Sequence, residues 1–190
     1  MIKATKEKVF GAPTPMAGLA LGIASLGWCW ENAAPLNGYG QLMGAVIASL
    51  LLVVLTVKFL FHRHLLAEDL AHPVVGSVVP TFAMATMVVS NAVGLWFPIA
   101  GDVLWLFAVG LHIVFLVTFV YHRAKQFELH HMVPSWFVPP VGIVVADVSF
   151  SGNPHLALVA QSTLIFGLVA YAAMLPVMIY RLIFASEIPD

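Results

Sequence analysis

This 190-residue sequence has few charged residues: only 9% of its residues are Asp, Glu, Lys or Arg. Hydrophobic residues make up 61% of the chain, and its mean hydropathy is +0.98. Soluble globular domains carry roughly 25% charged residues, so this composition excludes an ordinary soluble domain. A nucleic-acid role is excluded as well, since there is no basic aromatic surface. The sequence predicts an integral membrane protein whose surroundings are the lipid bilayer.

Cysteine is nearly absent too. The single Cys29 cannot form an internal disulfide, and we interpret it as a small packing residue. Clustered carboxylates, an HExxH pattern and a plausible Ser/His dyad are also lacking, so we expect no enzymatic activity and no metal site.

The sequence contains long stretches without Asp, Glu, Lys or Arg. Six of them are near or above the ~20 residues that cross a bilayer as a helix: 9–30, 32–57, 70–101, 103–122, 129–146 and 148–180. The alternating pattern of a barrel strand is missing, so the expected fold is all-α with six transmembrane helices. All eight basic residues precede the first stretch or follow the second, fourth and sixth. By the positive-inside rule both termini are expected in the cytoplasm, with the chain in the plasma membrane, the inner one in a bacterium.

An internal repeat divides the chain into three helical hairpins. FHR at 61–63 recurs as YHR at 121–123, and a weaker IYR lies at 179–181. A proline opens each unit on the cytoplasmic side: Pro13, Pro73 and Pro134. We therefore predict hairpins over about 13–63, 73–123 and 134–181, all entering the membrane in the same direction as parallel repeats of one transmembrane domain.

The odd-numbered helices differ in composition from the even-numbered ones. Odd stretches carry prolines and small residues, whereas even stretches are bulkier, although Pro176 is an exception. This pattern predicts kinked inner helices around an axis and a lipid-facing outer layer, although small residues also mark close helix packing. The candidate pore-lining or kink residues are Pro15, Gly18, Gly22, Ser25, Ser77, Pro80, Thr81, Asn91, Pro139, Pro140, Gly142 and Ser149.

A membrane cytochrome or quinone-reactive subunit is the alternative that eight histidines raise. A bis-histidine haem site needs two facing histidines inside the membrane. Only His112 lies deep in a stretch, where a neutral histidine bonded to a neighbouring helix is the simpler interpretation. We therefore expect no cofactor.

Three segments carry a resemblance to a known family. The segments HMVPSWFVPPVG (131–142), PTPMAGLALG (13–22) and HP at 72–73 with Pro80 beyond resemble the tellurite-resistance/C4-dicarboxylate transporter family, relatives of the plant guard-cell slow anion channels. The resemblance implies a channel-like pathway for small anions, lined by odd helices. It leaves the anion open among tellurite, chloride, nitrate, sulfite and dicarboxylates.

The family also implies ten spans in five hairpins, of which this chain supplies three. Its pore-occluding phenylalanine belongs to the ninth helix, so no residue here takes that role. We therefore expect an incomplete ring, completed by further C-terminal hairpins or by self-association, and little selective anion flux from the 190 residues alone.

Overall fold

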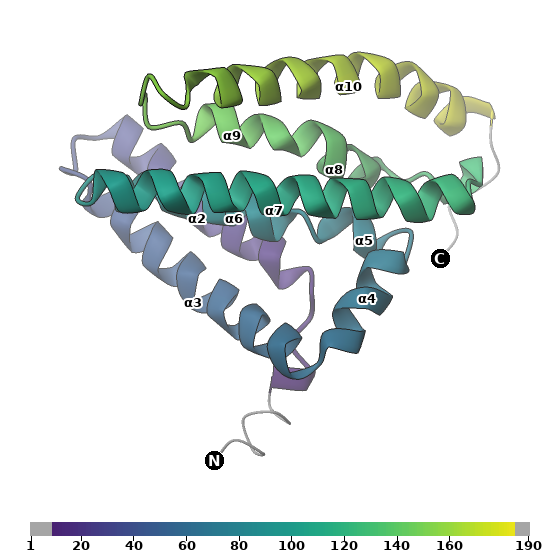
Figure 1. Ribbon diagram of the computed structural model, residues 1–190, viewed down its shortest axis with the longest axis horizontal. Coiled ribbons are helices and arrows are strands. Elements are labelled where there is room, and N and C mark those ends of the chain that lie inside the picture. The colour runs from purple at the N-terminus through teal and green to yellow at the C-terminus, as the bar shows by residue number, and fades with distance from the viewer. Residues whose placement is uncertain (1–8, 185–190) are drawn as a thin grey trace.

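The computed structural model describes residues 9–184, in which every regular element is helical (Figure 1). The main α-helices are α2 (Met16–Ala33), α3 (Tyr39–Phe61), α4 (Arg63–Ala71), α5 (Val75–Val78), α6 (Thr81–Gly94), α7 (Pro98–Lys125) and α10 (Ala157–Phe184). Between α7 and α10 lie short turns: 3-10 η1 (Leu129–His131), 3-10 η2 (Pro134–Phe137), α8 (Val138–Val141), 3-10 η3 (Gly142–Val144) and α9 (Val145–Val148). The all-α prediction is confirmed for the described part of the chain.

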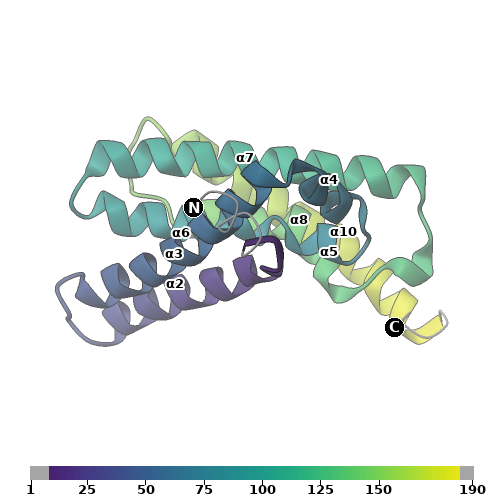
Figure 2. The same cartoon turned by 90° about the horizontal axis from the view of Figure 1, so that it is seen from below.

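Consecutive elements pack as antiparallel neighbours. Helix α2 lies beside α3, α6 lies beside α7 (Figure 2), and α10 packs along α8, η3 and α9. Helix α6 also contacts α2, α3 and α9, so it joins all three groups. The basic residues gather where α3, α7 and α10 end; we call this the basic end, defined by Lys58, Arg63, Arg123, Lys125 and Arg181.

The loop between α2 and α3 is organised by one carboxylate. The backbone N–H groups of Leu36, Gly38 and Gly40 donate to Glu31 at 3.1, 2.8 and 3.2 Å. Asn37 and Gly38 have φ of 56° and 87°, a left-handed conformation that these two residue types adopt most readily. Glu31 therefore satisfies N–H groups at the start of α3 that have no partner within the helix.

Glycines let the helices of each pair approach closely: Gly27 with Gly44, Gly94 with Gly101, and Gly167 in α10. A Cβ added to Gly27 would lie 2.9 Å from the Cα of Gly44, and one added to Gly101 would lie 2.6 Å from the Cα of Gly94. A Cβ on Gly167 would lie 2.3 Å from a valine methyl of η3. Lipid tails are as apolar as the helix surfaces, so the hydrophobic effect does not hold membrane helices together. Close backbone packing at small residues is a main source of their association instead.

Prolines break the α5–α6 unit and the 134–148 segment, as the sequence predicts for Pro80. Helix α5 ends at Val78 and α6 starts at Thr81, with Pro80 between them as the N-cap. Pro134 opens η2, and Pro139 and Pro140 lie within the single turn of α8. A proline lacks the N–H that continues an α-helix, which explains why the 134–148 segment runs as a series of short turns.

Four helical units of the described chain are long and apolar enough to cross a membrane: Tyr39–Phe61, Val75–Gly94, Pro98–Lys125 and Ala157–Phe184. The 18-residue window of Val75–Gly94 is 78% buried, compared with 33%, 33% and 17% for the other three. The unit containing α6 is therefore the centre of the packing, while α3, α7 and α10 present most of their surface outward. The count of six spans, which adds α2 and the 134–148 segment, stays a prediction.

Candidate functional site

The candidate residues on α2 form an open strip. Pro15 and Gly22 are exposed, and Gly18 and Ser25 are half-buried. Nothing lies within 4 Å of a Cβ built on Gly18 or Gly22. Helix α2 uses its other face, with Ala17, Ala20, Ala24 and Gly27, to pack against its neighbours. These four candidates thus share one uncovered face, which we call the α2 strip.

The candidates around Pro80 are enclosed by protein. Pro80, Ser77 and Thr81 are all buried. The Thr81 hydroxyl donates to Val78 O at 2.7 Å, and the Ser77 hydroxyl lies 2.7 Å from that of Ser135 in η2. The hydroxyls therefore serve the local backbone and the contact between α5 and η2, a use that is common for Ser and Thr in membrane helices.

The candidates of the 134–148 segment meet α6 and α7. Pro139 is buried, and its carbonyl accepts a hydrogen bond from His112 Nε2 at 2.8 Å. Gly142 is half-buried, and a Cβ there would lie 2.8 Å from Met84 Sδ. Pro140 is half-buried and lines a hollow between α7 and α10. His112, which is fully buried, therefore donates from α7 to the backbone of α8.

An amide bridge links α3, α6 and the residue after α9 at the end opposite the basic one. Gln41 Nε2 of α3 donates to Asn91 Oδ1 at 2.7 Å, and Asn91 Nδ2 donates to Ser149 O at 3.0 Å. The Ser149 hydroxyl itself donates to Val145 O. Asn91 and Ser149 were candidates for a pore wall, and the structure brings them together in a contact between α6 and the residue that follows α9. Gln41 is a partner that sequence reasoning missed.

Two buried cations at the basic end, Lys58 and Arg123, donate hydrogen bonds to backbone carbonyls that precede Pro13 and Pro73. Lys58 Nζ donates to Ala12 O at 2.8 Å and to Thr14 Oγ1 at 3.1 Å, and Thr14 in turn donates to Asp69 on α4. Arg123 Nη2 donates to Ala71 O, two residues before Pro73. Lys58 thus bonds a carbonyl just ahead of Pro13, and Arg123 bonds one just ahead of Pro73.

Sequence reasoning missed the roles of Lys58 and Arg123. The signal for Lys58 was its position inside an apolar run, where a cation needs a partner. The sequence repeat paired Arg123 with Arg63, whereas the residue that bonds a carbonyl ahead of Pro13, as Arg123 does ahead of Pro73, is Lys58. Arg63 is instead exposed at the start of α4.

Candidate ligands for a metal ion or a haem are the next feature to consider in the described part of the chain. Among residues 9–184, no group of three or more His, Cys, Asp or Glu side chains could hold a metal ion. His112, the deep histidine on which the cytochrome alternative depended, has its Nε2 engaged by a backbone carbonyl. The prediction of a neutral histidine bonded to a neighbouring helix agrees with this contact.

Within residues 9–184, four helical units long and apolar enough to cross a membrane, with Lys58, Arg123 and Arg181 buried near helix ends, define a multi-pass membrane protein. A comparison with protein-family models identifies the class: residues 12–190 match the SLAC1 family, described as voltage-dependent anion channel, and the chain belongs to this family.

Two curated relatives are uncharacterised transporters of Methanocaldococcus jannaschii. One is 31% identical over 148 residues, which cover 68% of this chain and 42% of the relative. The other is 28% identical over 156 residues, covering 73% of this chain and 44% of the relative. The chain thus spans less than half the length of the relatives it matches. The family consists of transport proteins, which is consistent with the expectation of no enzymatic activity.

Proposed function

We propose that this chain forms part of a channel-like pathway for small anions. Its inner elements are α2, α5–α6 and the 134–148 segment, and α3, α7 and α10 are its outer helices. The three hairpins 13–63, 73–123 and 134–181 make six spans. Family membership supports anion transport, and the names of the two relatives support transport in general.

The observation that carries this proposal is the burial contrast between the Val75–Gly94 unit and helices α3, α7 and α10. The Val75–Gly94 unit is 78% buried, while the outer helices are 17–33% buried over their most apolar windows. In a membrane the outward-facing helices α3, α7 and α10 contact lipid, so we assign the path to the remaining elements. Backbone that departs from helical geometry is tolerated at membrane depth only against protein or a water-filled cavity, which favours the proline-broken elements for the inner role.

A channel needs to attract anions only weakly, so that they can leave the pathway as readily as they enter it. Lys58 and Arg123 lie near the ends of their helices and bond to backbone carbonyls, so neither stands at membrane depth as a fixed anion ligand. Selectivity then depends on pore width, hydroxyls and backbone dipoles at the breaks, which let an anion leave as readily as it enters. The α2 strip is the part of the proposed wall that is open in these three hairpins.

Flux measurements in liposomes test the function. The chain extended at its C-terminus by two further hairpins of a relative should give anion-selective flux, while the 190 residues alone, as a monomer, should give little. Failure of the folded, extended chain to pass anions would contradict the transport function. Strong anion flux from the demonstrated monomer would contradict the incomplete ring.

Orientation is a separate part of the proposal, because all loops at the basic end should be cytoplasmic. Single cysteines in a Cys29→Ser background test it. Gly101 is unsuitable for labelling because it packs against Gly94, so exposed positions are chosen. An impermeant thiol reagent added outside should label cysteines at Ala34, Ile99 and His155 but not at Glu68 or Gln126. The opposite pattern would overturn the orientation.

A further inference from the structure

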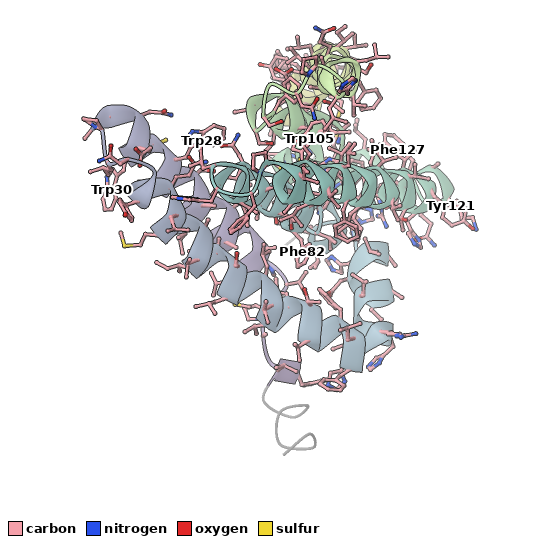
Figure 3. All side chains as sticks on the ribbon, turned by 60° about the vertical axis from the view of Figure 1, so that its left-hand side comes forward. Trp28, Trp30, Phe82, Trp105, Tyr121 and Phe127 are labelled. Atoms are coloured by element: carbon pink, nitrogen blue, oxygen red, sulfur yellow. The ribbon has the colours of Figure 1, made fainter. Side chains whose placement is uncertain are left out.

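A deep apolar groove lies between α3 and α7 and is closed at the basic end by α4. Its volume is about 500 Å³, within the ~300–1,000 Å³ typical of ligand sites. In Figure 1 the three helices form the sides of a triangle, and Figure 3 shows Phe82 of α6 between α3 and α7. The side chains that line it are mainly aliphatic and aromatic, among them Leu55, Leu60, Phe82, Phe107, Leu111 and Phe115.

The floor of the groove is packed, and its walls are open. Leu55, Val79 and Phe115 are buried at 0%, 2% and 7% exposure, so the groove does not continue into the protein. Leu60 and Phe107 on the walls are 62% and 61% exposed. Because α3 and α7 are helices of membrane-spanning length, the medium at these walls is hydrocarbon. Water does not fill a cavity that offers so few polar partners, so a hydrocarbon chain is the suitable occupant.

A cation stands where the groove reaches the basic end. Arg63, the first residue of α4, lines the groove and is exposed. No hydrogen bond or ion pair joins its guanidinium to another residue within 9–184, whereas nearby Lys58 is occupied by Ala12 and Thr14. A guanidinium presents a planar fork of donors that matches a phosphate. The groove thus combines an apolar surface for a hydrocarbon chain with an available anion-binding group, Arg63, at the bilayer edge.

A second groove, between α7 and α10, provides an internal comparison. Its volume is about 390 Å³, and its lining includes Phe119, Phe127 and Trp136. Arg123 lines it at the repeat position of Arg63, yet Arg123 is buried and donates to Ala71 O. This second groove has the apolar shape but its arginine is committed to the backbone.

We propose that the α3–α7 groove binds an anionic phospholipid, with one acyl chain in the groove and the phosphate on Arg63. The α7–α10 groove accommodates an acyl chain without preference for the head group. The assignment depends on membrane embedding and on these contacts, and it is independent of anion transport.

Photo-crosslinking in nanodiscs tests the lipid site on the full 190-residue protein. The probes are phosphatidylglycerol and phosphatidylcholine that each carry a photoreactive diazirine on an acyl chain, and mass spectrometry maps the adducts. Phosphatidylglycerol should give adducts concentrated on Phe107, Leu111 and Phe115, in excess over phosphatidylcholine. Arg63→Gln should lower that excess about tenfold, the scale of one lost charge-assisted hydrogen bond. The yield of adducts in the α7–α10 groove should be the same for Arg63→Gln and the parent protein.

Two matched controls separate the groove from ordinary boundary lipid. Lys125→Gln, which removes an exposed cation outside both grooves, should leave the excess intact. Leu111→Trp should fill the groove and remove adducts of both lipids, whereas Val117→Trp, on the exposed face of α7, should retain them. Adducts spread evenly over exposed positions such as Val114, or an excess that survives Arg63→Gln, would overturn the proposal.

Discussion

Replacing Gly22 on the α2 strip by leucine should block the proposed pathway without weakening the fold. Nothing lies within 4 Å of a Cβ at Gly22, so the side chain enters open space. Glycine is about 0.8–1.0 kcal/mol less favourable than alanine inside a helix, and leucine is close to alanine. The variant should therefore be as stable as the parent or slightly more stable, by about 0.5–1 kcal/mol.

Gly110 on α7 is the matched control, since a Cβ there also meets nothing within 4 Å and the residue is exposed on an outer helix. Anion flux of the extended chain in liposomes should fall several-fold for Gly22→Leu and remain unchanged for Gly110→Leu. Thermal unfolding in detergent should show both variants folded. Equal flux from the two variants would refute the assignment of the α2 strip to the pathway.

A contrasting glycine checks the packing argument itself. A Cβ at Gly27 would lie 2.6 Å from Gly40 O and 2.9 Å from the Cα of Gly44, both backbone atoms. Gly27→Ala should therefore destabilise the α2–α3 pair by about 1–3 kcal/mol, the usual cost of overpacking. A midpoint of thermal unfolding equal to that of the parent would contradict the close helix contact.

Further variants test other hydrogen bonds between segments far apart in the chain. His112→Phe should lower stability by about 1–3 kcal/mol, because it leaves a buried carbonyl without its donor, and an unchanged unfolding midpoint would count against that bond. A double-mutant cycle of Gln41→Met and Asn91→Leu should give a coupling energy of about 0.6 kcal/mol, with zero coupling excluding the amide bridge. Lys58→Met should cost about 1–3 kcal/mol, whereas Lys125→Met at an exposed site should stay within about 0.5 kcal/mol; equal effects would contradict the special position of Lys58.

The sequence predicted the features that depend on single residues with strong backbone preferences. Pro80 breaks the α5–α6 unit because the missing N–H acts wherever a proline stands. Pro134 opens a helical turn for the same reason. The all-helical fold followed from backbone satisfaction in lipid, which does not depend on the details of packing.

The side-chain partners of the candidate site could not be predicted in the same way. A membrane helix is apolar on all sides, so hydropathy does not reveal which face turns toward which neighbour. Asn91 could therefore be read as a pore residue, although it bonds Gln41 and the backbone of Ser149. The link from Lys58 through Thr14 to Asp69 could not be predicted either, because it joins residues far apart in the chain.

The most direct test of the central claim is the reversal potential of the extended chain in a planar bilayer under a salt gradient. We expect a potential near that of the anion, since the only carboxylates of the proposed inner elements, Glu31 and Asp147, lie at the end opposite the basic one. A current that reverses near the cation potential, from protein shown to be folded, would contradict anion conduction.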